Sequence, residues 1–153
     1  MIKKVLGVYS AMLIGICSSV TQAEDQNRNS PQAGTRTYAQ NYKDTALAIC
    51  ITTAYKYDAD VAKDAGSSVS ALRDWGSYDL EQGPLAIRRL VDDYLTRDYH
   101  NPIVESEVRG VRFDLLKCLD MYHSEELEAQ VRSWVFPQER TYRQDSSLPL
   151  KAK

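Results

Sequence analysis

The stretch IRRLVDDYL, residues 87–95, decides the fold class because its apolar residues recur at the spacing of a helix. Arginine and aspartate occupy the opposite face, and the apolar stripe consists of Ile87, Leu90, Val91, Tyr94 and Leu95. A stripe of this width predicts an amphipathic helix that buries one side in a protein core. One such helix cannot form a core alone, so its partners must lie elsewhere in the chain.

Similar periodicity predicts four more helical segments. Two precede the stretch, one running to Tyr55 behind a possible N-cap at Asn41 and one from Val61 to Trp75. Gly66 and the serines after it leave open whether the second segment divides into two short helices. Two segments follow, with Ser124 suited to cap the last, and their apolar stripes are Leu115, Leu116, Leu119 and Tyr122, then Leu127, Val131, Trp134 and Val135.

Two stretches break the helical pattern, residues 76–84 and residues 98–110, and both are predicted loops. No part of the sequence alternates in the manner of a strand with β-branched enrichment. The sequence therefore predicts an all-α protein, a compact bundle of about five helices.

The first residues have the pattern of an export signal. Lys3 and Lys4 precede an apolar run and a small-residue exit, which indicates a signal peptide cleaved before Glu24. The alternatives are an uncleaved membrane anchor, for which the run is short, and a lipoprotein modified at Cys17, which bulky Ile16 precedes.

The remaining chain divides by composition. Residues 1–23 form the predicted signal peptide, and residues 24–37 are polar and are expected to be a disordered leader. Residues 38–136 hold all the helical periodicity and form the predicted domain. Residues 137–153 are expected to be a flexible tail.

Charge and cysteine content narrow the function classes. Cleavage removes Lys3 and Lys4 from the 19 bases and keeps all 21 acids, so the mature chain has a net charge of −4. This balance disfavours nucleic acid and anionic membranes as partners, because binding either requires concentrated positive charge. In the oxidising compartment that a secretion signal implies, Cys50 and Cys118 are expected to form a disulfide that staples the bundle.

The sequence contains no recognisable catalytic, cofactor-binding or metal-binding pattern. A phosphate-binding glycine loop, a nucleophile elbow and a zinc-protease motif are all missing from it. Asp120 and His123 lie one helical turn apart but have no third ligand for a metal. Cys118 and His123 lie five residues apart, which turns them to different faces of a helix. We therefore expect no enzyme activity, no metal and no cofactor.

Two segments resemble a known family. The segment LLKCLDMYHSEELEAQVRSWV, residues 115–135, resembles the C-terminal helices of the type VI secretion amidase immunity proteins. The segment NYKDTALAICITTAY, residues 41–55, is similar to that family's first helix. The resemblance runs from about Tyr38 to Val135 and includes the cysteine pair and the secretory signal.

This resemblance implies a periplasmic helical protein without catalytic activity that protects its own cell from a secreted cell-wall amidase. Family members are homodimers, and two immunity chains with two effectors form the complex. A helix of one chain and a protruding loop of the other would together block the effector's cleft. The effector would be similar to the papain-related cysteine peptidases.

Residues 98–110 are the expected inserted loop, because they combine aromatic and acidic residues of the kind that anchor interfaces. The candidate contacts, chosen for expected exposure and composition, are Arg73, Asp74, Tyr78, Tyr99, Asn101, Glu105 and Glu107. An ordinary solvated loop is an equally open interpretation.

The alternative function is a periplasmic adaptor or chaperone that holds client proteins. Such a protein should expose a broad apolar patch, whereas the predicted apolar stripes are all expected to be used by the core. A small hydrolase is a third interpretation, and it lacks a nucleophile and a base in the sequence.

Overall fold

The computed structural model describes residues 29–107 and 110–147, and the side chains of residues 105–107 fall outside the description. The described residues from Gln32 onward belong to one compact unit. The predicted signal peptide and the leader up to residue 28 lie outside the described residues.

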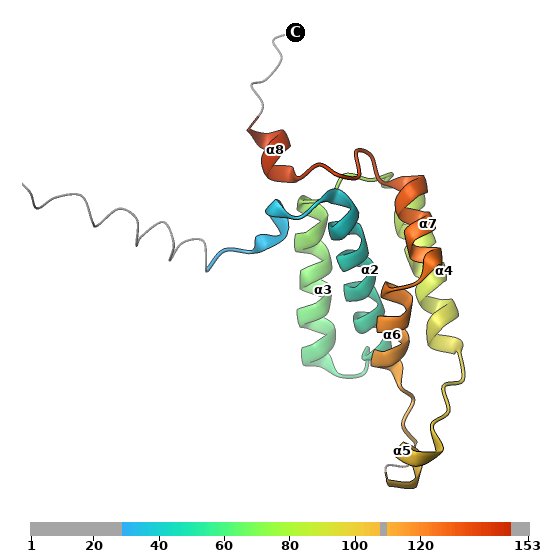
Figure 1. The fold of residues 1–153 in the computed structure, drawn as a ribbon. Coiled ribbons are helices and arrows are strands. Elements are labelled where there is room, and N and C mark those ends of the chain that lie inside the picture. Colours follow the sequence, from blue (N-terminus) through green and yellow to red (C-terminus); the bar gives the residue numbers. More distant parts are fainter. Residues whose placement is uncertain (1–28, 108–109, 148–153) are drawn as a thin grey trace, which may run out of the picture. The chain divides into compact units, whose positions relative to one another are not determined.

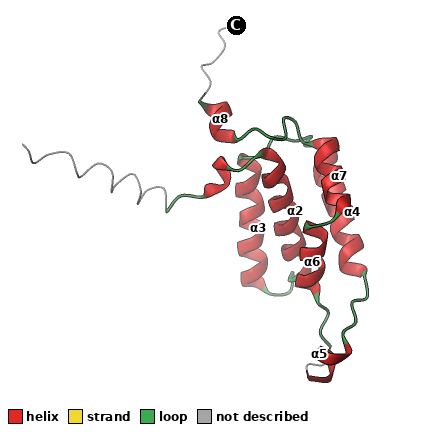
Figure 2. Cartoon of the chain, viewed as in Figure 1, coloured by secondary structure: helices red, strands yellow, loops and turns green. Residues whose placement is uncertain are grey.

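The described residues form helices joined by loops, without a strand among them (Figure 2). The five longer helices are α2 (Tyr38–Ala54), α3 (Ala59–Asp74), α4 (Gln82–Thr96), α6 (Asp114–Tyr122) and α7 (Glu125–Trp134). The three short ones are the 3-10 helix η1 (Gln32–Thr35), α5 (Pro102–Glu107) and α8 (Tyr142–Ser146). The all-α fold predicted from the sequence is confirmed.

Helix α2 is the centre of the bundle, because it packs against α3, α4, α6 and α7 (Figure 1). Its fully buried hydrophobic side chains are Tyr42, Ala46 and Cys50, spaced four residues apart and therefore on one face. Around them lie Ile87 and Val91 of α4, Cys118 and Met121 of α6, and Leu127 and Val131 of α7.

The start of α2 differs from the prediction. Thr37, not Asn41, is the N-cap, and it forms a capping box in which Gln40 bonds back to the Thr37 N–H. Asn41 is fully buried inside the helix, where its amide nitrogen donates to the carbonyls of Ala33 and Trp75 at 2.9 Å each. Asn41 therefore fastens η1 and the end of α3 to α2.

Helices α3 and α4 flank α2 in different ways. Helix α3 runs unbroken through Gly66, and none of its sixteen residues, all within the described part of the chain, is buried. Helix α4 buries the stripe predicted from residues 87–95, with Ile87, Leu90, Val91 and Tyr94 all in the core. The amphipathic helix predicted for residues 87–95 is thus confirmed, and it lies in the core.

The predicted disulfide is present and joins α2 to α6. Cys50 and Cys118 are both fully buried, with their Cα atoms 5.7 Å apart. Because Cys118 must face Cys50, the bond sets the rotation of α6 about its own axis.

That rotation makes the predicted core stripe of α6 wrong. Leu115, Leu116 and Leu119 are 49%, 47% and 39% exposed. The buried residues are those on the Cys118 side of the helix: Asp114, Lys117, Cys118 and Met121. Three leucines therefore face outward on a helix whose core face carries a charged pair.

The C-terminal residues contribute more than the expected flexible tail. Ser124 caps α7 as predicted, accepting from the Leu127 N–H. Beyond it, Thr141 pairs with Thr37 in a single bridge, and the Tyr38 hydroxyl donates to Asp145 at 2.6 Å. Residues 137–147 therefore hold the start of α2, and residues 148–153 lie outside the description.

None of the helices in the described ranges is long and apolar enough to cross a membrane. Among the same residues, no cluster of three histidine, cysteine, aspartate or glutamate side chains is arranged to hold a metal ion.

Candidate functional site

The candidate contacts fall at opposite ends of the bundle. Arg73 and Asp74 are exposed in the last turn of α3, and Tyr78 follows them in the connection to α4. Tyr99 and Asn101 come after the other end of α4 (Figure 1). Helix α4 spans 15 residues, which is about 22 Å at the usual helical rise. The two groups therefore do not form one patch on the monomer.

Tyr78 is not the exposed loop residue that the sequence suggests. Its ring packs edge-on against Tyr42, with centroids 5.3 Å apart, and its backbone bridges to Val135. A Cβ atom at Gly76 or Gly83 would come within 2.8 or 2.9 Å of the Tyr78 ring, so the two glycines make the slot that holds it. Burial raises the pKa of Tyr78. The residue is part of the fold.

The predicted 98–110 loop belongs to a segment that leaves the bundle between α4 and α6. We call residues Arg97–Phe113 the protruding segment; α5 lies at its far end (Figure 1). Ile103 in α5 is 80% exposed, and no other helix packs closely against α5 within the described chain. The Asn101 side chain accepts from the Ile103 N–H at 3.2 Å and so supports the first turn of α5. The side chains of the other two candidates, Glu105 and Glu107, lie outside the description.

Tyr99 is tied to the bundle rather than aimed outward. Its hydroxyl donates to the Asp120 carboxylate at 2.7 Å, and this hydrogen bond raises the pKa of Tyr99. Its ring borders a hollow of about 300 Å³ lined by Tyr99, His100, Asn101, Phe113 and Leu116. Tyr99 thus holds the first part of the protruding segment against α6.

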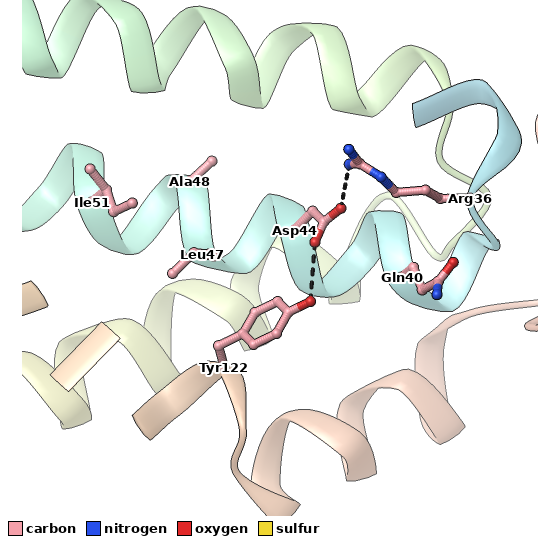
Figure 3. A pocket seen from close by; sticks show the side chains of 7 residues that line it. All are labelled: Arg36, Gln40, Asp44, Leu47, Ala48, Ile51 and Tyr122. Carbon is pink, nitrogen blue, oxygen red and sulfur yellow. Dashed lines mark hydrogen bonds and ion pairs between the residues drawn. The ribbon is translucent and has the colours of Figure 1, made fainter. Parts of the chain in front are cut away.

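A second hollow, of about 430 Å³, lies along α2 and was not anticipated from the sequence (Figure 3). Its floor is Leu47, Ala48 and Ile51, and its rim includes Arg36, Asp44 and Tyr122. The rim groups pair with one another: Arg36 donates to Asp44 at 2.7 Å and Tyr122 to Asp44 at 3.3 Å (Figure 3). Burial, followed by the Asp44 charge, raises the pKa of Tyr122. The hollow therefore offers apolar surface and few uncommitted polar groups.

The sequence of α2 contains a pattern that could have indicated this hollow. Leu47 and Ile51 lie off the Tyr42–Ala46–Cys50 face, so α2 carries apolar residues on more than one side. A helix that is apolar over two faces indicates two contact surfaces.

Helix α6 connects the two hollows. Leu116 borders the hollow of the protruding segment, and Tyr122 borders the one on α2. Leu115 and Leu119 share the Tyr122 side of the helix, since these positions are four and three residues apart. The exposed leucines therefore belong to an apolar surface that runs from the protruding segment along α6.

The two candidate pairs for metal binding or catalysis, Asp120–His123 and Cys118–His123, make other contacts. Cys118 is in the disulfide, and Asp120 accepts from Tyr99. His123 packs edge-on against the Tyr122 ring at 5.1 Å between centroids. The arrangement binds and positions side chains, and it brings no nucleophile next to a base among the residues described.

Comparison with known proteins places these features in a family. Residues 40–131 match the Tai4 family, described as type VI secretion system amidase immunity proteins. No curated protein is similar enough to the chain to count as a match.

Two solved structures share the fold. A chain from the type VI-secreted toxins and self-resistance proteins of Serratia marcescens is 28% identical, with a TM-score of 0.68 over 78% of this chain and 94% of that chain. A chain from the Tae4/Tai4 effector–immunity system of Salmonella typhimurium is 24% identical, with a TM-score of 0.59 over 68% of this chain and 95% of that chain. The second likeness supports the fold alone.

Proposed function

The chain belongs to the Tai4 family of type VI secretion amidase immunity proteins, and on that premise we propose that it binds a cognate secreted peptidoglycan amidase and occludes its active-site cleft. The observation that supports this binding mode is the protruding segment, whose helix α5 lies beyond the packed helices (Figure 1) and includes Ile103, which is 80% exposed. A cleft can be blocked by shape alone, so this role requires no catalytic group.

The segment has the features of an inserted element. Binding becomes more favourable when a partner's cleft removes an exposed apolar side chain from water. The neighbouring Asn101 and Tyr99 already have partners within this chain, so part of the segment is ordered before binding, which lowers the entropic cost of association. Glu105 and Glu107, which follow Ile103 in the sequence, are the proposed acidic contacts.

The proposal includes a homodimer that forms a two-plus-two complex with the effector. Arg73 and Asp74 lie near the start of α4, and the protruding segment leaves from the other end of this helix, which is about 22 Å long. One effector could meet both groups if the segment came from one protomer and the end of α3 from the other. Light scattering on the purified complex tests this, and a one-to-one mass contradicts the dimer.

We also propose that the protein works in the periplasm after removal of residues 1–23. The buried Cys50–Cys118 disulfide supports this location, since such bonds persist in oxidising compartments. Mass spectrometry of the exported protein tests the cleavage, and a mature chain that does not begin at Glu24 contradicts it.

The occlusion proposal is tested by titrating the mature protein against the amidase in a peptidoglycan hydrolysis assay. Ile103→Asp should weaken inhibition at least tenfold, because it places a charge in the desolvated centre of the contact. Glu105→Ala should weaken it less. The matched control is Tyr57→Asp in the α2–α3 loop, where the parent side chain is 89% exposed. Inhibition by Ile103→Asp within twofold of the parent would sink the assignment of the segment.

One observation favours the second candidate, an adaptor that holds client proteins. The expectation that the core uses all apolar stripes is wrong for α6, because Leu115, Leu116 and Leu119 face outward. Exposed apolar patches are typical of binding surfaces of either kind. A pull-down distinguishes the two functions: one tight partner whose amidase activity is lost supports the immunity role, and many weak partners support the adaptor.

A further inference from the structure

The protruding segment depends on how its two ends are held. It leaves the bundle after α4 and returns just before α6, and no other helix packs closely against α5 in the described chain. The direction of its tip is therefore decided by the contacts at its base.

A buried lysine lies at that base. Lys117 of α6 is only 4% exposed. Its ammonium donates to the Leu95 carbonyl at 3.2 Å and to the Asp114 carboxylate at 3.2 Å. It also lies 5.8 Å from the centroid of the Tyr99 ring. One side chain thus contacts the end of α4, the start of α6 and the first part of the protruding segment.

Each contact has a physical reason. Leu95 lies in the last turn of α4, where carbonyl oxygens lack partners within the helix and the helix dipole favours a cation. Asp114 is the first residue of α6, where a carboxylate is favoured. Its second oxygen forms an ion pair with Arg112 at 3.1 Å, so both oxygens of this buried acid have partners.

The stability of the core does not require a lysine at position 117. Burying an ammonium is costly, and apolar residues of similar size often replace buried ion pairs without loss of stability. What an apolar residue cannot do is bond the carbonyl of one helix and the carboxylate of the next in a single geometry. The Lys117 contacts therefore favour one arrangement of the end of α4 and the start of α6 over others.

We infer that Lys117 is a positioning residue, which joins the end of α4 to the start of α6 and so fixes the direction of the protruding segment for the amidase. The inference rests on the proposed function for its final step only. The Tyr99–Asp120 hydrogen bond acts in the same sense, because Asp120 lies one turn beyond Lys117 on α6. Segment and bundle are held before the partner arrives, and preorganisation of this kind raises affinity.

The test compares two lysine variants. Lys117→Met removes the ammonium at the base of the segment. Lys43→Met is the matched control, since Lys43 is a partly buried lysine that, like Lys117, pairs with an acid, Glu128, but it lies on α2. Each variant is measured for amidase affinity, thermal midpoint and hydrogen exchange of residues 97–113 in the free protein.

Lys117→Met should bind the amidase at least tenfold more weakly and exchange the amides of residues 97–113 faster, while the rest of the bundle keeps its protection. Lys43→Met should bind within threefold of the parent and leave those amides unchanged. Affinity of Lys117→Met within twofold of the parent, or equal losses in both variants in proportion to their thermal midpoints, would overturn the inference.

A second variant covers the case in which Lys117→Met does not fold. Tyr99→Phe removes only the hydroxyl that bonds Asp120, and it should weaken binding about threefold with faster exchange in the segment. Unchanged exchange would count against the positioning role. The exchange result needs no amidase, so it separates this inference from the proposed function, whose own test is Ile103→Asp.

Discussion

The rotation of α6 leads to a prediction in which the structure and the helical periodicity rank two substitutions in opposite order. Met121 is fully buried and Leu115, on the same helix, is 49% exposed. Met121→Ala should lower the free energy of unfolding by about 2–5 kcal/mol, the range for truncating a buried residue and leaving a cavity. Leu115→Ala should cost about 1 kcal/mol or less, because solvent already reaches half of the side chain and no cavity forms.

Urea unfolding followed by circular dichroism measures both costs, and thermal unfolding supports it at about 3–4 °C per kcal/mol for a domain of this size. Both variants place alanine in the same helix, so intrinsic helix propensity changes little between them. Each is measured at two protein concentrations, because a second protomer covering Leu115 would make its cost concentration-dependent.

Equal costs for the two variants at low concentration would refute the reasoning. That result would mean that Leu115 faces the core, as the periodicity predicts, and that the disulfide does not set the rotation of α6. A larger cost for Leu115→Ala would also remove the exposed leucines from the binding surface.

Three further predictions follow from the same structure. Replacing Cys50 and Cys118 together with alanine should lower the free energy of unfolding by about 4 kcal/mol in the chain-entropy model, given their sequence separation of 68; an unchanged urea midpoint would contradict this. Thr37→Ala should cost about 1 kcal/mol through loss of the α2 cap, and equal melting curves would argue against the cap. Burial raises the pKa of Tyr42 above its ordinary value. The free energy of unfolding should therefore fall as the pH rises above about 10, because the tyrosine then ionises in the unfolded chain while it stays neutral in the fold. Between pH 9 and pH 11 the free energy of unfolding of Tyr42→Phe should fall by about 1.4 kcal/mol less than that of the parent. Parallel pH profiles of stability for the two proteins would rule this out.

Periodicity predicted the fold class because α4 has a single apolar face. Ile87 and Val91 could be buried in one way only, since arginines and aspartates occupy the other side. In α6, Leu116 and Cys118 are two residues apart and so lie on different faces of a short helix that is apolar over both. Spacing alone could not choose between those faces, and the bond to Cys50 did.

The candidate contact residues were likewise predicted only in part from the sequence. The sequence identified the 98–110 region, and Tyr99 and Asn101 do lie in a segment that leaves the bundle. The role of Tyr78 was missed, because a ring packed between two glycines and against Tyr42 depends on residues distant in the chain. Lys117 is one residue of the 115–135 segment in the sequence, and its burial depends on the way α4 and α6 pack together.

The amino-acid sequence alone was enough to predict the helical class, the pairing of Cys50 with Cys118 and the family resemblance, because each depends on local periodicity, residue count or a contiguous motif. Three features required the packed fold: the buried face of α6, the position of Arg73 and Tyr99 beyond opposite ends of α4, and the contacts by which Lys117 joins the end of α4 to the start of α6. The physical reason is that helical spacing states which residues share a face, whereas the packing of one helix against another states which face meets the core.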